Sequence, residues 1–309
     1  MNQPVFYPLF LGIDGGATRS RARLEDAKGA LLATAEGGPC NVHRDFDGAC
    51  LTVESLARAC IEHAGLKPSA ISETYAGLGL AGLGQHRDRE AMAGWPHPFL
   101  GISLATDAHV ACLAAFGGRT GSVLVVGTGS CAVALVGSRT VRRGGWGFPI
   151  SDEGSGSWLG LKAVHHALAA YDGTGVADSL SEAVLERFDD DAEEIVAWAR
   201  TATPADYGTL APMVVAAAAN GLEAATAILV EGGRLLSLLA RTVLIDKTDG
   251  LAVVGGLSTV MTPYLEPDVL DRVVAPKAPA EAGAVLLAKE HVGYTKALPR
   301  TVNDLLEPS

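Results

Sequence analysis

Apolar and polar positions repeat with a period of two in two separate stretches of this chain. The first runs from Leu9 to Ala35 and the second from Gly121 to Trp146. Each consists of an apolar strand, a Gly turn, an alternating strand, a second Gly turn and a third strand, so each predicts an antiparallel meander. Few residues are identical between the two stretches, but their shared plan indicates an internal repeat.

Helical periodicity follows the first meander and dominates the region after the second. Apolar residues recur at helical spacing from Asp47 to Gly65, and Gly65 and Pro68 mark the end of that amphipathic helix. The pattern predicts strands at 71–80, 102–105 and 251–256, and further helices at 108–118, 156–219, 223–244 and 281–291. Strands alternating with helices in this way predict an α/β protein.

Three Gly turns at strand ends are the main candidates for chemistry. Asp14–Thr18 and Gly127–Ser130 can cradle phosphates through backbone N–H groups and the hydroxyls of Thr18, Thr128 and Ser130. The third turn, Gly255–Ser258, can accommodate a flat adenosine, and Asp14 can hold Mg²⁺ directly or through water. Any one of these turns could serve only to connect two elements, and the first could be an ordinary hairpin turn. Their order within duplicated meanders favours a nucleotide site, although no P-loop motif occurs.

Asp107 follows a predicted strand and opens a predicted helix, where it could be a helix cap, a general base, or both. The stretch 142–160 is Gly-rich and resembles a substrate loop. In it, Trp146 and Phe148 would face a sugar ring, while Ser151 and Asp152 would meet hydroxyls or would cap the following helix. Asn41, in an earlier Gly-rich loop, is a further candidate for hydroxyl binding or a turn residue only.

Charge and composition limit the kinds of molecule that the protein is expected to bind. The 309 residues are 48% hydrophobic and 19% charged, which indicates a globular core, and the net charge of −11 argues against nucleic acid. The N-terminus shows no basic region or long apolar run, so we expect a cytoplasmic protein with no membrane anchor. Oligomeric state stays open, a homodimer included. The cysteines show no disulfide or metal spacing: Cys40, Cys50, Cys60, Cys112 and Cys131.

Other motifs indicate either a structural role or a competing function. Gly77, Gly79 and Gly82 match the dinucleotide-binding pattern G-x-G-x-x-G, but no acid stands at the expected distance, so an NAD-linked oxidoreductase is a remote alternative. His109 and the pair His165–His166 are interpreted as helix residues without carboxylate or cysteine partners at ligand spacing. The acidic run 189–194 is interpreted as a solvated helix start.

Together, the DGG-x-T turn, the GTGS turn, the TDA strand end and the late GG-x-S resemble the actin-like superfamily of sugar kinases and heat-shock ATPases. Within it, the N-acetylglucosamine kinase and BadF/BadG/BcrA/BcrD branch is the most similar. FPISDEGSG (148–156) and ATPADYG (202–208) are most similar to bacterial glucosamine kinases. The resemblance extends from Leu11 to about 291 and differs at Ala17, where these kinases often carry a third Gly.

The resemblance implies two ribonuclease-H-like α/β domains with an interdomain cleft. The expected boundaries are 1–117, with the helix 281–291 packing back on it, then 118–280, and a polar tail at 292–309. It also implies an ATP- and Mg²⁺-dependent kinase for the 6-hydroxyl of glucosamine, with N-acetylglucosamine as the alternative. Two remoter alternatives lack their sequence requirements: a dehydratase-activating ATPase needs paired cluster cysteines, and a sugar-sensing repressor needs a preceding helix-turn-helix.

Site residues follow from the same resemblance, each by its place in a matching motif. Asp107 is the expected base, and Asp14 the expected magnesium ligand. Asn41, Asp107, Trp146, Ser151 and Asp152 are expected to bind the sugar. The ATP-binding set is Asp14, Gly15, Gly16, Thr18, Gly127, Thr128, Gly129, Ser130, Gly255, Gly256 and Ser258.

Overall fold

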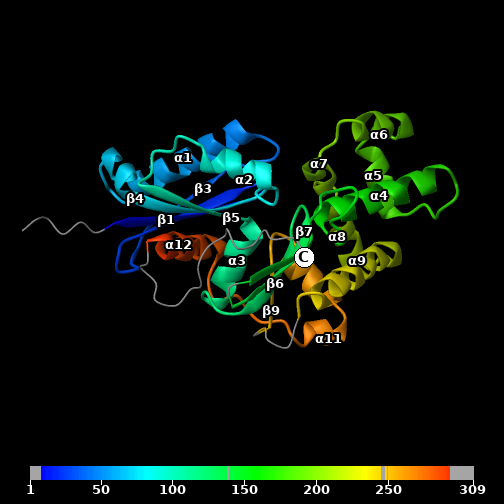
Figure 1. Cartoon of the computed structure of the whole chain (residues 1–309). Helices are drawn as coiled ribbons and strands as arrows, with labels where there is room; N and C mark the ends of the chain where they lie inside the picture. Colours follow the sequence, from blue (N-terminus) through cyan, green and yellow to red (C-terminus); the bar gives the residue numbers. More distant parts are fainter. Residues whose placement is uncertain (1–7, 138, 245–247, 249, 293–309) are drawn as a thin grey trace, which may run out of the picture.

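Two mixed β-sheets with the same local plan form the framework of the molecule (Figure 1). The structure is a computed structural model that describes residues 8–137, 139–244, 248 and 250–292. The first sheet has the order β3-β2-β1-β4-β5 and the second the order β8-β7-β6-β9. Their strands are β1 (Leu9–Gly15), β2 (Ser20–Glu25), β3 (Leu31–Gly37), β4 (Thr74–Leu80), β5 (Gly101–Ala105), β6 (Gly121–Val126), β7 (Ser130–Val136), β8 (Arg139–Gly144) and β9 (Leu251–Val254).

The predicted internal repeat is confirmed by the pairing of these strands. β1–β2–β3 and β6–β7–β8 are antiparallel meanders, and each gains a parallel neighbour from later in the chain, β4 in the first sheet and β9 in the second. The actin-like α/β fold class predicted from the sequence is therefore present. Residues 68–73, of which 71–73 were predicted as strand, form the short 3-10 helix η1 (Pro68–Glu73), which carries Pro at its start.

Helices cover both faces of the first sheet. α1 (Phe46–His63) packs on β2 and β3, whereas α3 (Asp107–Phe116) and α12 (Ala280–His291) lie between the two sheets. Figure 1 shows α12 and α3 below the first sheet and to the left of β6 and β9. α12 contacts β1, β4 and α3. The predicted tail lies, from residue 293, outside the described residues.

Glycines bring these helices unusually close to the sheet. A Cβ at Gly77 would overlap the carbonyl oxygen of Ala284 on α12, and one at Gly79 would overlap Val110 on α3. Both glycines lie inside β4 and not in a strand-to-helix turn, so the G-x-G-x-x-G match has a packing explanation. The position of these glycines therefore does not support a dinucleotide-binding site.

The region 156–219, predicted as mostly helical, is broken into five helices. Ser155, Asp178, Asp191 and Thr203 act as N-caps for four of them. The acidic run is therefore a turn at 189–190 followed by the cap Asp191. The helices are α4 (Gly156–Tyr171), α5 (Ser179–Glu186), α6 (Ala192–Ala199), α7 (Pro204–Gly208) and α8 (Ala211–Ala219), followed by α9 (Glu223–Arg241), α10 (Ser258–Met261) and α11 (Pro267–Leu270); α2 (His86–Ala93) lies earlier in the chain.

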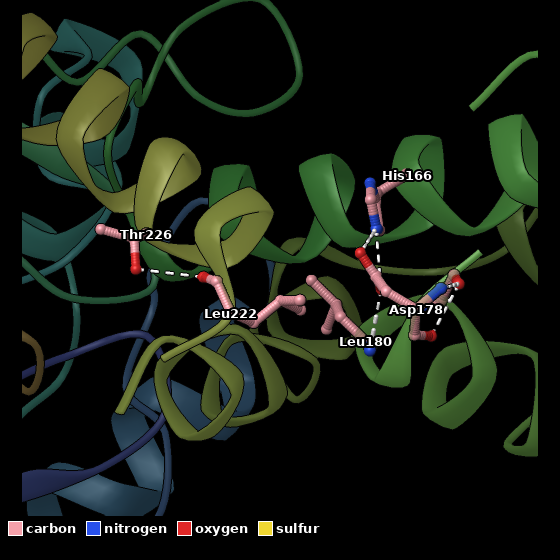
Figure 2. Close-up of polar contacts among 6 residues, drawn as sticks. His166, Asp178, Leu180, Leu222 and Thr226 are labelled. Atoms are coloured by element: carbon pink, nitrogen blue, oxygen red, sulfur yellow. Dashed lines mark hydrogen bonds and ion pairs between the residues drawn. The ribbon is translucent and has the colours of Figure 1, made fainter. Parts of the chain in front are cut away.

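One histidine departs from the sequence-based interpretation. His166 on α4 has a carboxylate partner, with its Nε2 2.9 Å from Oδ2 of Asp178 (Figure 2). Asp178 also accepts from the amides of Leu180 and Ser181 at 3.0 Å, so one carboxylate both caps α5 and ties it to α4. His109 is a helix residue of α3 as predicted; it is half-buried, and burial lowers its pKa to about 4.

A search for membrane-spanning helices among the described residues gives no single candidate. One pair of helices, Pro204–Ala219 and Glu223–Arg241, reaches the required length and hydropathy together, but it is bent by 117°.

Candidate active site

The first Gly turn is fixed by neighbouring chain segments and leaves its tip open. The carbonyl oxygen of Gly15 accepts from the amide of Ala81 at 2.7 Å, and that of Gly16 from the amide of Cys40 at 2.9 Å. The β1–β2 hairpin is therefore held by backbone hydrogen bonds at its base, and Thr18 is exposed at its tip.

The second turn is attached to the start of α4. The carbonyl of Gly127 accepts from the amide of Gly156 at 2.8 Å, and that of Thr128 from the amide of Ser157 at 3.2 Å. These bonds satisfy two of the otherwise unpaired amides at the helix N-terminus. They also place the positive end of the α4 dipole behind the turn, which favours an anion there.

Asp152 lies buried beneath this turn and binds it through its carboxylate. Backbone hydrogen bonds from Ser130 and Gly147 stabilise the charged form, but burial outweighs them and the pKa of Asp152 is raised. Its Oδ1 is buried and has no hydrogen-bond partner within the described chain. The Ser130 hydroxyl donates to the carbonyl of Glu153 at 2.8 Å, so this side chain holds the loop in place.

The third turn lies directly beside the second. A Cβ at Gly127 would stand 4.0 Å from the amide nitrogen of Gly256. Gly255 has a φ of 105° and no room for a side chain, because a Cβ there would overlap the carbonyl of Val126. The hydroxyl of Ser258 donates to the carbonyl of Gly255 at 2.8 Å and is used within the turn.

The structure identifies the helix caps near the site. Thr106 is the N-cap of α3, and its hydroxyl accepts from the amide of His109 at 3.2 Å. The cap of α4 is Ser155. The interpretation of Asp107, Ser151 or Asp152 as N-caps is therefore wrong, and their carboxylates and hydroxyl are not needed for that purpose.

Asp107 stands at the first position of α3, at the carboxyl end of β5. Its Oδ1 accepts from the amide of Ala108 at 2.9 Å. Burial raises the pKa of Asp107, while the hydrogen bond from Ala108 and the charge of Arg142 partly oppose that rise. The carboxyl thus lies in a partly desolvated position where a nearby cation favours its ionised form.

Asp14, at the end of β1, is electrostatically coupled to Asp107. Burial, then Asp107, then Glu281 raise the pKa of Asp14 to about 7, against the weaker opposing effect of Arg21 and Arg19. Glu281 comes from the first turn of α12 and is itself 8% exposed, and its Oε2 has no hydrogen-bond partner in the described part of the chain. Two carboxyl groups thus converge from β1 and α12 beside a third on α3.

Asn41 is placed next to the loop that follows β4. It forms a parallel bridge with Ala81, and a Cβ at Gly82 would stand 2.6 Å from its Oδ1. That oxygen already accepts from the amides of His43 at 3.1 Å and Arg44 at 3.2 Å. A ligand would therefore meet the Nδ2 donor of Asn41 and not its acceptor.

The predicted substrate loop divides into an exposed and an inward-facing part. Trp146 is 79% exposed, and the guanidinium of Arg142 lies 5.9 Å from its ring centre. Phe148 packs against Tyr207 of α7 with ring centres 4.9 Å apart, so part of its ring surface is used within the protein. Ser151 is half-buried at the turn before Asp152.

Three residues of this region were missed by the sequence analysis: Arg89, Arg142 and Glu281. Arg142 comes from β8 and influences the pKa of both Asp107 and Asp152. It lies at the start of the predicted substrate loop, but no local pattern gives it a role. Glu281 precedes an apolar helical run and reads as an ordinary first-turn acid.

A surface hollow of about 290 Å³ lies elsewhere, between α1 and the end of β3. Its lining includes Gly37, Gly38, Leu51 and Leu56, and none of the predicted site residues.

Residues 11–288 match the family model described as the BadF/BadG/BcrA/BcrD ATPase family. The chain belongs to this family. It is 33% identical over 291 residues to the glucosamine kinase GspK of Vibrio cholerae, covering 94% of this chain and 99% of that protein. It is 28% identical over 260 residues to the N-acetyl-D-glucosamine kinase of Dictyostelium discoideum, covering 76% and 79%.

A solved structure agrees with this family membership. A Chromobacterium violaceum crystal structure, assigned as an N-acetylglucosamine kinase, superimposes with a TM-score of 0.85 at 35% identity, covering 91% of this chain and 99% of that chain. In this BadF/BadG family member, the Gly turns and the carboxylates of Asp14 and Asp107 therefore belong to a fold whose relatives include sugar kinases.

Proposed function

We propose that this chain is an ATP- and Mg²⁺-dependent kinase that phosphorylates the 6-hydroxyl of glucosamine. One observation carries the proposal: the carboxyl groups of Asp107 and Asp14 interact electrostatically at the edge of the first sheet, where α3 and the first Gly turn begin. A base beside a metal-binding carboxylate and a phosphate-sized turn is the arrangement that phosphoryl transfer requires.

In the proposed reaction, Asp107 accepts the proton of the sugar hydroxyl. Oxygen O6 forms a bond to the γ-phosphorus, the bond from that phosphorus to the β–γ bridging oxygen breaks, and ADP leaves. Oδ1 of Asp107 is held by the Ala108 amide, which leaves Oδ2 to take the proton. The charge of Arg142 opposes the effect of burial on the pKa of Asp107 and so favours the ionised base.

Backbone amides at the tips of the two hairpins are the proposed phosphate donors. The amides of Gly16 and Gly127 already donate within their turns, to the carbonyls of Arg19 at 3.0 Å and Gly129 at 2.9 Å. Among the described residues, no protein acceptor is recorded for four amides at these tips, and we assign phosphate binding to them and to the Thr18 and Thr128 hydroxyls. They are the amides of Ala17, Thr18, Thr128 and Gly129.

The residues around Asp14 fit a magnesium ion. Mg²⁺ prefers oxygen ligands and is commonly held by one or two carboxylates together with substrate phosphates. Asp14 supplies one carboxylate, and the unpartnered Oε2 of Glu281 lies close enough to affect its pKa. When bound with ATP, the ion would neutralise charge on the β- and γ-phosphates.

The sugar is assigned to Asn41, Asp107 and Asp152, with Trp146 at the outer edge. Asn41 offers donors only, whereas the unpartnered Oδ1 of Asp152 can accept from a hydroxyl or an ammonium group. Similarity to the Vibrio cholerae glucosamine kinase over almost the full length supports glucosamine. Similarity to the Chromobacterium violaceum and Dictyostelium discoideum proteins supports N-acetylglucosamine as the second candidate.

Cysteine placement argues against a dehydratase-activating ATPase. All five cysteines are free in the structure, four are buried and Cys131 is half-buried. A cluster shared between two subunits needs thiolates at the surface. Iron analysis of the purified protein offers a direct check on this alternative.

A coupled assay of ADP release tests the function. Glucosamine, N-acetylglucosamine, glucose and N-acetylmannosamine are compared at equal concentration with ATP and Mg²⁺. We expect the largest kcat/KM with glucosamine. A preference for N-acetylglucosamine would select the second candidate, and the absence of sugar-dependent ADP release would refute the kinase proposal.

A further inference from the structure

Two arginines, one from helix α2 and one from strand β8, meet at Gly84. Arg89 lies on α2 of the first sheet's side, and its Nη2 donates to the carbonyl of Gly84 at 3.4 Å. Arg142 comes from β8 of the second sheet, and a Cβ at Gly84 would overlap its Nη1. The two guanidinium groups therefore converge on the same glycine from different halves of the fold.

The two guanidinium groups have no carboxylate partner among the described residues, and Nε of Arg89 has no acceptor there. Nε of Arg89 is buried without a hydrogen-bond partner in the described chain. Nη2 of Arg142 donates to the carbonyl of Gly145, a neutral acceptor. Within the described residues, neither arginine lies within 4.0 Å of a carboxylate oxygen. Burial, then the charge of Arg142, lower the pKa of Arg89, as expected for like charges held close together.

The surroundings indicate where an anion would be held. Gly84, where the two guanidinium groups meet, follows Gly82, whose Cβ position lies 2.6 Å from Oδ1 of Asn41. The charge of Arg142 also acts on the carboxyls of Asp107 and Asp152, so the pair lies near residues assigned to the sugar. Gly84 has no side chain that could block the approach to Nη1 of Arg142. Guanidinium groups bind phosphate oxygens in a bidentate manner, and two of them match the charge of a phosphomonoester dianion.

We propose that Arg89 and Arg142 form a binding site for the phosphoryl group as it passes to the sugar, and hence for the 6-phosphate of the product. This inference rests on the proposed kinase function. The arginines would stabilise charge on the transferred group, as cationic clamps do in other phosphoryl transfers. Because Arg89 comes from α2 and Arg142 from β8 of the second sheet, the site would be complete only when both elements are correctly placed.

Isothermal titration of the full-length protein tests the proposal. Arg89→Gln and Arg142→Gln are compared with wild type for binding of glucosamine 6-phosphate, inorganic phosphate, glucosamine and ADP. We expect each variant to bind glucosamine 6-phosphate about 10- to 100-fold more weakly, the range for losing a charge-assisted hydrogen bond. Binding of glucosamine and ADP should change less than about threefold.

Neighbouring arginines supply matched controls. Arg87→Gln, on the same helix as Arg89, and Arg143→Gln, next to Arg142, remove the same charge from exposed positions. Both controls should bind glucosamine 6-phosphate as wild type does. An equal loss of affinity in the controls and the test variants would show an effect of overall charge and overturn the proposal. Test variants that bind both glucosamine 6-phosphate and a non-hydrolysable ATP analogue as wild type does would also overturn it.

A non-hydrolysable ATP analogue separates the two sources of the phosphoryl group. Loss of affinity for the analogue but not for ADP would show that the arginines hold the γ-phosphoryl before transfer, and loss for glucosamine 6-phosphate would show that they hold it afterwards. Either result supports the site. If wild type shows no sugar-dependent ADP release, the kinase function fails. If wild type is active but both test variants bind both ligands normally, only the arginine site fails.

Discussion

At the residue scale, the central feature is a set of carboxyl groups whose surroundings differ although they lie together. Burial raises the pKa of Asp14, Asp107 and Asp152, but their neighbours are distinct. Asp14 faces other acids, whereas Asp107 and Asp152 face the guanidinium of Arg142. Asp14 is therefore suited to take up a metal ion, whereas the guanidinium beside Asp107 offsets part of the burial that favours its neutral form.

Removing the proposed base gives the first prediction. Asp107→Asn should lower kcat by about 10²- to 10⁴-fold while leaving sugar binding largely unchanged, because the amide cannot accept the hydroxyl proton. Steady-state ADP release and direct sugar titration measure the two effects. Thr106→Ala serves as a control, since it removes the cap of α3 without touching the base. Turnover close to wild type in Asp107→Asn would exclude Asp107 as the base.

The raised pKa of Asp14 predicts a pH effect on stability. Its pKa moves from 3.8 to about 7 on folding, so the folded state binds the extra proton and stability falls as pH rises across this window. Melting temperatures of the metal-free protein from pH 5 to pH 8 should therefore fall more steeply for wild type than for Asp14→Asn. Mg²⁺ with ATP should restore stability at pH 8, because the metal needs the ionised carboxylate.

Glu281→Gln provides a second check on the same carboxyl group. The substitution removes a charge that raises the pKa of Asp14, so the fall in melting temperature should be smaller and should level off at a lower pH than in wild type. Identical slopes in wild type and Asp14→Asn would contradict the burial argument, and an unshifted profile in Glu281→Gln would remove Glu281 from the site.

At the element scale, strand patterns were sufficient to predict both meanders, because a sheet covered on its faces imposes period two or continuous apolar runs. The helices of 156–219 were merged, although their caps Ser155, Asp178, Asp191 and Thr203 are visible as residue types. A cap is only recognised once the adjoining turn is known. The packing of the C-terminal helix on the first sheet was expected from the family resemblance alone. Gly77, which makes room for α12, was noticed only as part of the dinucleotide-binding pattern.

The link between α4 and α5 gives an element-scale prediction. Asp178→Ala should lower the free energy of unfolding by about 1–2 kcal/mol, because the cap of α5 and the contact to His166 are lost together. Asp191→Ala is the matched control: Asp191 caps α6 through the amide of Glu193 at 2.8 Å but has no histidine partner. Denaturant unfolding followed by circular dichroism measures both.

The pH dependence separates this pair from a simple cap. Burial raises the pKa of Asp178, but hydrogen bonds from Ser181 and His166 outweigh it, and the net pKa is lowered. Its stabilising effect should therefore be present above pH 3.8 and be lost as the pH falls further. Equal losses in Asp178→Ala and Asp191→Ala would contradict a separate contribution from His166.

At the whole-molecule scale, the candidate site combines side chains from segments far apart in sequence. Sequence motifs identified the three turns and Asp107, since each lies at a strand end with a recognisable pattern. Arg89, Arg142 and Glu281 could not be found in this way, because their importance depends on contacts between distant elements. The proposed boundaries, residues 1–117 with 281–291 against 118–280, divide these contributors between two units.

Two units that share one site predict a change of shape on binding. We expect the radius of gyration from small-angle X-ray scattering to decrease when a non-hydrolysable ATP analogue and glucosamine are both present, because closure would exclude water from the phosphoryl group. Either ligand alone should give a smaller change. An unchanged radius with both ligands would contradict closure between these units.

The most direct test of the account is the position of the phosphate on the product. Phosphorus–proton correlation NMR of a reaction with glucosamine, ATP and Mg²⁺ should show a phosphomonoester coupled to the two protons on C6, formed in equal amount to ADP. Asp107→Asn should form this ester far more slowly. ADP and free phosphate without a sugar ester, or an ester at another carbon, would contradict the central claim.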